Sequence, residues 1–317
     1  MRQILHDCDP GHDDMIAMMV ACASRATRLL GVTTVAGNQT GEKTNMNARR
    51  VLTLIGRKDI PLARGADKPL LRELEIAPFI HGDSGLDGAI LPEPEVKPVD
   101  LPAADFIAKI LAESKDRVTI VPTGPLTNIA LFLLKDPRLK EKIERIVIMG
   151  GAARDSNITP GAEFNIYVDP EAADIVFSSG LPITQVSLDV TNRTLLSFDD
   201  IDQVTKMNGR VSRLAGPLLR FFAETNKRVF GIDGAPVHDA LAMAVAIDPS
   251  ILTTRRVNVV IEREGKYTRG QTVVDLYGVS HRTANVDFSV KVDVDKVRKV
   301  MLDSIRQLDE EAGRFRA

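Results

Sequence analysis

Short apolar runs alternate with helical patterns along most of the 317-residue chain. This alternation predicts parallel strands joined by helical crossovers, and therefore an α/β fold. The runs are apolar enough for a sheet covered on both faces, and they span residues 4–8, 29–35, 118–122, 146–149 and 183–188. Helices are predicted over residues 13–24 and 43–55. Another begins at Asp169-Pro170-Glu171, where a capping aspartate precedes a proline in the first turn.

The composition excludes several classes of protein. With 44% hydrophobic and 26% charged residues, the chain has a globular rather than a disordered composition. A formal net charge of -2 gives no basic surface for nucleic acid or an anionic membrane. The longest apolar run, residues 15–23, is shorter than the roughly 20 residues that cross a bilayer. The N-terminal residues lack a secretory pattern, and Cys8 and Cys22 lack disulfide or metal-finger spacing, so we expect a cytoplasmic protein with reduced thiols.

We expect one catalytic domain over residues 1–308 and a charged C-terminal tail over residues 309–317. Residues 64–101, called the flap segment below, are rich in Gly and Pro, and their His81-Gly82-Asp83 sequence favours a functional flap over an ordinary surface connection. Residues 257–262 and 267–274 flank a loop of hairpin length. This pattern predicts a small antiparallel extension of the sheet.

The most specific motif places four carboxylates, those of Asp7, Asp9, Asp13 and Asp14, between the first strand and the first helix. Ligands bind at this end of open α/β sheets. Two carboxylates about 5 Å apart would repel each other by roughly 3 kcal/mol at an effective dielectric constant near 20. A divalent cation offsets that repulsion, and an all-oxygen donor set suits Ca²⁺ or Mg²⁺. The alternative is that these acids only cap turns and the helix, but four of them in one turn favour a metal site.

Further polar residues follow other predicted strands or begin helices. His238-Asp239 precedes the apolar run 240–247, where Asp239 can complete the oxygen set and His238 can donate a proton near neutral pH. Amide and carboxylate side chains in the long loop after residue 151 can bind the hydroxyl groups of a sugar; they are Asn157, Glu163 and Asn165. Asn38 and Thr123 also follow strands. Each could belong to an ordinary turn or helix cap, but their shared position favours one crevice.

Several motifs are in register from about residue 4 to about residue 292. They are Asp7-Cys8-Asp9-Pro10-Gly11-His12-Asp13-Asp14, Val35-Ala36-Gly37-Asn38-Gln39-Thr40, Pro122-Thr123-Gly124, Met149-Gly150-Gly151, Ala162-Glu163-Phe164-Asn165 and Val237-His238-Asp239. Together they resemble the motifs of the nucleoside hydrolases, most closely the inosine/uridine-preferring and pyrimidine-preferring branches. The resemblance implies one domain with a Rossmann-like, largely parallel sheet flanked by helices. It also implies hydrolysis of the N-glycosidic bond of ribonucleosides to ribose and free base.

The resemblance further implies a role for each matching residue. One Ca²⁺ per chain would be held by the side chains of Asp9, Asp14 and Asp239 and by the carbonyl of Thr123. Asp13 would be the general base, Asn38 would support the metal and the water, and His238 would protonate the leaving base. Substrate contacts would come from His81, Met149, Asn157, Glu163, Phe164 and Asn165. The partner would be a small ribonucleoside rather than nucleic acid or membrane, and we expect a homotetramer or homodimer.

Two departures from the family pattern and two other functions bear on this interpretation. His6 replaces a residue that is usually aliphatic, and Phe230 replaces a tyrosine of several relatives, so a phenol cannot relay a proton to the base. Purine and pyrimidine preference both stay open.

Asp7 and Asp9 also resemble the acids of a haloacid dehalogenase-like Mg²⁺-dependent phosphohydrolase, although Pro10-Gly11 fits that family badly. A non-catalytic ribose-binding or nucleoside-binding module would need the same sugar contacts without a general base.

Overall fold

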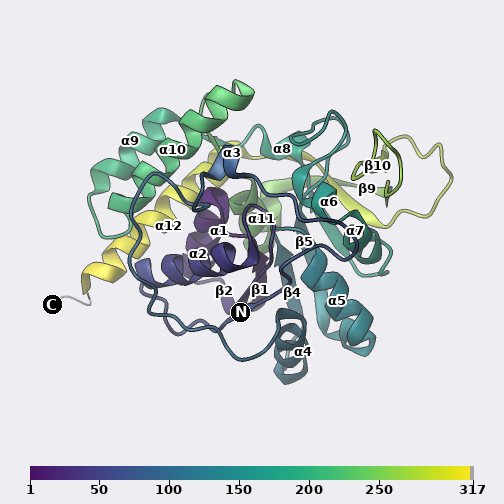
Figure 1. Ribbon diagram of the computed structural model, residues 1–317, viewed down its shortest axis with the longest axis horizontal. Coiled ribbons are helices and arrows are strands. Elements are labelled where there is room, and N and C mark those ends of the chain that lie inside the picture. Colours follow the sequence, from purple (N-terminus) through teal and green to yellow (C-terminus); the bar gives the residue numbers. More distant parts are fainter. Residues whose placement is uncertain (315–317) are drawn as a thin grey trace.

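A nine-stranded sheet forms the centre of the protein, whose computed structural model describes residues 1–314 (Figure 1). Its strand order is β10-β9-β11-β6-β5-β4-β1-β2-β3. The strands are β1 Arg2–Cys8, β2 Thr27–Thr34, β3 Leu62–Arg64, β4 Val118–Pro122, β5 Ile143–Met149, β6 Ile183–Val186, β9 Leu252–Ile261, β10 Thr272–Asp275 and β11 Val286–Val292. Neighbours from β3 to β11 are parallel, whereas β9 is antiparallel to both β11 and β10. The predicted α/β fold with an antiparallel extension is confirmed.

Helices cover both faces of the sheet (Figure 1). They are α1 His12–Ala23, α2 Gly41–Leu54, α3 Pro78–His81, α4 Ala103–Glu113, α5 Thr127–Lys135, α6 Phe164–Val168, α7 Pro170–Phe177, α8 Leu188–Thr191, α9 Phe198–Met207, α10 Ser212–Phe230, α11 His238–Ile247 and α12 Val294–Arg314. Alternate residues of β1 enter opposite cores: Ile4 packs in the core that includes α1 and α11, and Leu5 in the core that includes α4 and α5. This alternation explains why the central strands are apolar throughout.

Helix α1 is the most enclosed helix near the site. Every one of its residues is buried, because it packs against α11 and α12 as well as the sheet. A helix that is apolar on all sides suits such a position, but α1 also carries Asp13 and Asp14 in its first turn. Its start is fixed by Asp14, whose Oδ2 accepts a hydrogen bond from the Gly11 amide at 3.0 Å. The fold therefore holds two carboxylates on a rigid, solvent-excluded element.

The structure differs from the sequence prediction in the hairpin and at one strand end. The strand predicted from residue 267 begins only at Thr272, because the Gly270 amide bonds back to the Glu262 carbonyl at 2.7 Å and closes a longer loop. Gly270 has φ +78°, which favours glycine. The strand predicted over 183–188 ends at Val186, and Leu188 already begins α8.

The C-terminal helix takes in part of the predicted tail. Helix α12 continues through residue 309 to Arg314, so the first part of the predicted tail is helical; residues 315–317 lie outside the described residues. The boundary at residue 308 stays a prediction. Among residues 1–314, no helix is long and apolar enough to span a membrane. Cys8 and Cys22 are both buried free thiols.

The flap segment is mostly irregular but is fixed to the body of the protein. Its one helical turn, α3, contacts α10 and carries His81. The amide of Asn47 donates to the Ser84 carbonyl at 2.9 Å, and that of Gln39 donates to the Gly82 carbonyl at 3.2 Å. These bonds from the loop before α2 and from α2 itself hold His81 over the carboxyl ends of the strands.

Candidate active site

A cavity of about 340 Å³ lies at the carboxyl ends of the parallel strands. Open α/β sheets bind ligands at this edge. Its lining includes most of the side chains predicted from the sequence: Asp13, Asn38, His81, Thr123, Met149, Asn157, Glu163, Phe164, Asn165, His238 and Asp239. The other two, Asp9 and Asp14, are fully buried behind this lining. The fold thus gathers residues that are as far apart in sequence as Asp9 and Asp239.

Buried carboxylates form the floor of the cavity. Asp13, Asp14 and Asp239 each offer an oxygen within 4.8 Å of the others. Asp9 lies next to them, with Oδ2 accepting from the Asn38 amide at 2.7 Å. Asp9 Oδ1 and Asp13 Oδ1 are buried without a hydrogen-bond partner. Buried carboxylate oxygens normally have partners, so this unfilled acceptor capacity is what a metal ion would use.

The burial and close packing of these carboxylates raise their pKa values. Burial and the neighbouring Asp14 raise the pKa of Asp13 to about 8, and burial raises the pKa of Asp14 to about 6. Burial and the Asp13 and Asp14 charges hold the pKa of Asp239 well above its usual range. No lysine or arginine is among the described residues that line the cavity. A cation would therefore supply the compensating charge that the protein does not.

Two glycines make room for Asp9. A Cβ atom on Gly37 would lie 2.1 Å from Asp9 Oδ2, and one on Gly124 would lie 2.6 Å from Asp9 Oδ1. At either distance the Asp9 carboxylate would have to move. Asp7, the other acid of the motif, is instead part of the core: its Oδ1 accepts from Thr33 Oγ1 at 2.5 Å and Asn128 Nδ2 at 2.8 Å. Asp7 is fully buried and does not line the cavity.

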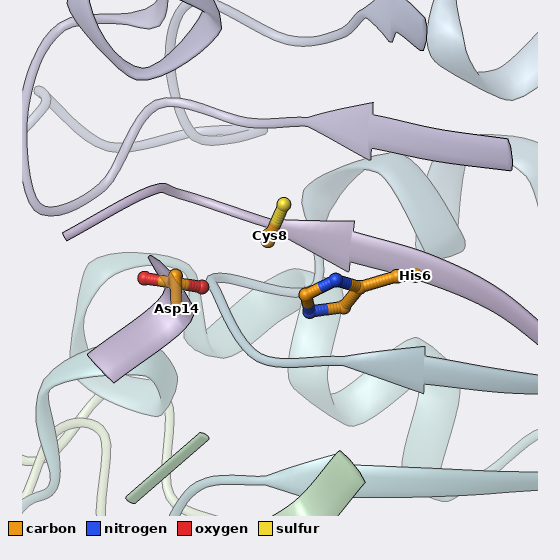
Figure 2. A group of neighbouring side chains, drawn as sticks. All are labelled: His6, Cys8 and Asp14. Carbon is orange, nitrogen blue, oxygen red and sulfur yellow. The ribbon is translucent and has the colours of Figure 1, made fainter. Parts of the chain in front are cut away.

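Thr123 contacts both the acids and Asn165 through its two oxygens. Its hydroxyl is 2.7 Å from Asp14 Oδ1 and 3.0 Å from His6 Nε2, while its carbonyl accepts from Asn165 Nδ2 at 2.8 Å. Figure 2 shows the His6 imidazole directed toward Asp14, with Cys8 two residues further along β1. His6, Cys8 and Asp14 also offer donor atoms within 4.8 Å of one another.

The long loop between β5 and α6 forms the wall that was predicted to contact the sugar. Glu163 caps α6, because its carboxylate accepts from the amides of Asn165 at 2.9 Å and Ile166 at 3.2 Å. Asn157 Oδ1 accepts from the Phe164 amide at 2.8 Å. These bonds fix the Asn157 and Glu163 side chains while leaving part of each in the cavity lining. Fixed polar groups of this kind can orient a polyhydroxylated ligand.

The opposite wall is aromatic and contains the two predicted histidines. His238 Nδ1 is 2.7 Å from Thr191 Oγ1, and burial lowers the pKa of His238 to about 4. Burial also holds the pKa of His81 well below its usual range. Both imidazoles are therefore neutral at pH 7, and each carries one N–H. His81 stacks on Phe222 at 5.3 Å, while Phe230 is 42% exposed at the rim.

Sequence reasoning missed several residues of this wall. Phe222 and Asn226 come from α10, and Ile232 follows it. The one sequence signal for this wall was Asn226, an asparagine within the buried face of the amphipathic helix α10. The sequence also gives no role to His12, whose Nδ1 is 3.1 Å from His81 Nδ1 and whose Nε2 is 2.8 Å from the Asp87 carbonyl.

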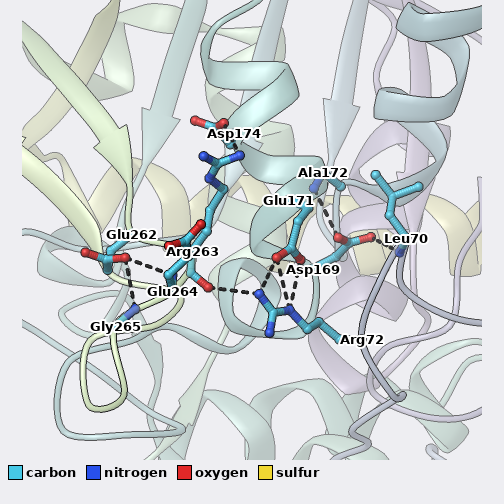
Figure 3. A network of polar contacts seen from close by, with 10 residues as sticks. All are labelled: Leu70, Arg72, Asp169, Glu171, Ala172, Asp174, Glu262, Arg263, Glu264 and Gly265. Atoms are coloured by element: carbon cyan, nitrogen blue, oxygen red, sulfur yellow. Dashed lines mark hydrogen bonds and ion pairs between the residues drawn. The ribbon is translucent and has the colours of Figure 1, made fainter.

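A polar network holds the first part of the flap segment against α7 and the β9–β10 loop (Figure 3). The Leu70 amide donates to Asp169 Oδ2 at 2.9 Å. Arg72 forms an ion pair with Glu171 and also donates to the Arg263 carbonyl at 2.9 Å. The predicted cap at Asp169 is confirmed, since its side chain accepts from an amide of the first turn of α7.

Comparison with known proteins gives matches over nearly the whole chain. A family model described as inosine-uridine preferring nucleoside hydrolase matches residues 4–299. The pyrimidine-specific ribonucleoside hydrolase RihA of Photobacterium profundum is 50% identical over 296 residues, covering 93% of this chain and 95% of that protein. RihA of Escherichia coli O17:K52:H18 is 51% identical over 294 residues, covering 92% of this chain and 94% of that protein. The solved structure of a purine-preferring ribonucleoside hydrolase from Gardnerella vaginalis superposes with a TM-score of 0.92 at 33% identity. The match covers 98% of this chain and 100% of that chain.

Proposed function

The chain belongs to the inosine-uridine preferring nucleoside hydrolase family and is a ribonucleoside hydrolase, and from this premise we propose its metal, mechanism and base preference. We propose that it cleaves the N-glycosidic bond with one Ca²⁺ per chain, and that pyrimidine ribonucleosides are its preferred substrates. The base preference is supported by the two curated relatives at about half identity, which are pyrimidine-specific. The haloacid dehalogenase-like and non-catalytic alternatives are not favoured, because the family match covers the whole site.

The carboxylate cluster carries the metal proposal. Side chains of Asp9, Asp14 and Asp239 and the carbonyl of Thr123 would hold the ion, an oxygen set that suits Ca²⁺. The unpartnered Asp9 Oδ1 and the absence of lysine and arginine from the described lining support this assignment. When bound, Ca²⁺ would offset the carboxylate charge and act as a Lewis acid toward a water molecule and the ribose diol.

Asp13 is the proposed general base. Its Oδ1 has no hydrogen-bond partner, and the side chain borders the cavity, so the carboxylate is free to take a proton. As the C1′–N bond breaks, its electron pair leaves with the base and the ribose gains oxocarbenium character. A water oxygen then bonds to C1′ and gives one proton to Asp13. Asn38, which donates to the Asp9 carbonyl at 3.1 Å, keeps the metal ligands and the water region in place.

The remaining site residues orient the substrate and assist the leaving group. Asn157, Glu163 and Asn165 would bind the ribose hydroxyls, with Met149 and Phe164 packing beside the sugar. The neutral imidazole of His238 would donate its proton to the departing base, and His81 would contact the base from the flap segment. An activated water, a fixed sugar and a neutralised leaving group are the three requirements of this reaction.

Replacement of Asp13 by Asn tests the central assignment. Asp13→Asn should lower kcat by about 10²- to 10⁴-fold, which is the usual cost of losing a general base. Ribose affinity and the thermal unfolding midpoint should change little, because the shape of the side chain is kept. The assay measures reducing sugar released from uridine, cytidine and inosine, with and without a chelator. Asp116→Asn, an exposed site at the other end of the sheet, is the matched control. Near-wild-type turnover by Asp13→Asn would exclude the role.

We also propose a homotetramer or homodimer. Large hydrophobic and aromatic side chains lie exposed near the antiparallel edge, including Tyr267, Tyr277 and Val279 at 79%, 81% and 76% exposure. Surface apolar patches of this kind are typical of contacts between subunits. Light scattering after size-exclusion chromatography distinguishes a monomer, which would contradict the proposal, from the two assemblies.

A further inference from the structure

His6 has a structural setting that the reaction does not explain. It lies on β1, is fully buried and does not line the cavity, yet its imidazole reaches the metal site through one intervening side chain. Its Nε2 is 3.0 Å from Thr123 Oγ1, which is 2.7 Å from Asp14 Oδ1 (Figure 2). The three side chains therefore form a continuous chain from the core to a proposed metal ligand.

The direction of each hydrogen bond in this chain can be assigned. An ionised Asp14 can only accept, and its Oδ1 at 2.7 Å is a much closer acceptor for the Thr123 hydroxyl than the Asp7 carbonyl at 3.5 Å, so the hydroxyl donates its one proton to Asp14. The hydroxyl oxygen can then only accept from His6, which requires a proton on Nε2. In the neutral ring, a proton on Nε2 leaves Nδ1 without one. In agreement, His6 Nδ1 is buried without any hydrogen-bond partner.

We propose that His6 is a positioning residue of the metal site, whose Nε2–H holds the Thr123 hydroxyl as a donor to Asp14. This inference rests on the proposed function, because Asp14 and the Thr123 carbonyl are its proposed metal ligands. Groups that orient metal ligands through hydrogen bonds commonly change metal affinity by about 10- to 100-fold when removed. Asp14 Oδ2 is already held by the Gly11 amide at 3.0 Å, so the His6 chain fixes the second oxygen.

The unpartnered Nδ1 separates this role from a contribution to stability. Burying a polar atom without a partner is unfavourable, and an aliphatic side chain at this position would avoid it. A histidine that served only the core would therefore be a poor choice. Its benefit must come through Nε2, which is the ring nitrogen that has a partner, because the nearby Cys8 thiol donates to the Thr33 carbonyl at 3.5 Å and not to the Thr123 hydroxyl.

Calcium titration of variants tests the proposal. His6→Leu should weaken Ca²⁺ binding about tenfold by calorimetry and reduce the Ca²⁺-induced rise in Tm, while Tm in chelator is unchanged or higher. His6→Gln, whose amide can donate from a similar position, should retain part of the affinity. KM for the nucleoside at saturating Ca²⁺ should be unchanged. Ile4→Val is the matched control, since Ile4 is also buried on β1 but packs in the apolar core, and it should bind Ca²⁺ like the wild type.

A double-mutant cycle asks whether His6 acts through Thr123. Thr123→Val removes the hydroxyl but keeps the carbonyl, so the effects of His6→Leu and Thr123→Val on Ca²⁺ affinity should not multiply. Wild-type affinity in His6→Leu, or effects that multiply in the double variant, would overturn the inference while leaving the metal site intact. A wild-type protein that shows no Ca²⁺ binding would instead contradict the metal proposal itself, and with it this role for His6.

Discussion

Binding of Ca²⁺ should release protons from the carboxylate cluster, because the metal-free site holds protons that the metal must displace. At pH 7 a group with a pKa of about 8, such as Asp13, holds about 0.9 of a proton, and one with a pKa of about 6, such as Asp14, holds about 0.1. The pKa values of Asp9 and Asp239 lie well above their usual range, so each of these carboxyls can hold at most one further proton. We therefore expect between about one and about three protons per Ca²⁺.

Calorimetry measures this number directly when the titration is repeated in buffers of different ionisation enthalpy, such as PIPES and Tris. The Ca²⁺ affinity should rise about tenfold per pH unit for each proton released. Asp13→Asn should still bind Ca²⁺ but release about one proton fewer at pH 7. An affinity independent of pH between 6 and 8, together with no proton release, would refute this account of the cluster.

The same shifts predict the pH dependence of stability. Each acid has a folded-state pKa above its unfolded value of about 3.8, so the folded, metal-free protein binds more protons than the unfolded chain. The free energy of unfolding in chelator should therefore fall as pH rises from about 6.5 to about 8, a range in which the buried histidines, whose pKa values are lowered, no longer offset the effect of the acids. Saturating Ca²⁺ should flatten this dependence, because the bound charge replaces the lost protons. Thermal unfolding across that range, with and without Ca²⁺, checks the sign.

Further variants test separate parts of the structure. His238→Ala should lower kcat for uridine and inosine but spare p-nitrophenyl riboside, whose leaving group needs no proton; equal losses on all three would mean an architectural role. His81→Ala should raise KM more than it lowers kcat in the same assays. Gly37→Ala, with its Cβ 2.1 Å from Asp9 Oδ2, should weaken Ca²⁺ binding at least about tenfold by calorimetry. Asp309→Ala removes the acceptor for two amides at the start of α10 and should cost about 1 kcal/mol in urea unfolding without changing kcat.

The central sheet could be predicted because its signals are local. The run 118–122 coincides with β4, and Asp169-Pro170 marks the start of α7, since an apolar run and a capping residue need no distant partner. The sequence did not indicate where β10 begins, because that depends on the Gly270 amide bonding across the loop to Glu262. It also did not reveal β3, a three-residue strand whose pairing depends on β2.

The same distinction applies to the site. Asp9, Asp13 and Asp14 could be proposed from one short motif at a strand end, where geometry concentrates ligands. Phe222 and Asn226 could not, because their place in the cavity depends on how α10 packs against the flap segment. The contact between His238 and Thr191 likewise joins two helices through tertiary packing alone.

The complete burial of α1 has a consequence for how the cavity can open. Its backbone amides are shielded by the sheet, α11 and α12, so their hydrogen exchange should require global unfolding. The flap segment has little regular structure and is held by side-chain hydrogen bonds, so its amides can exchange through local opening. The wall that carries Asp13 and Asp14 should thus be as long-lived as the native state, whereas opening of the wall that carries His81 should require only the loss of local contacts, such as the one between His81 and His12.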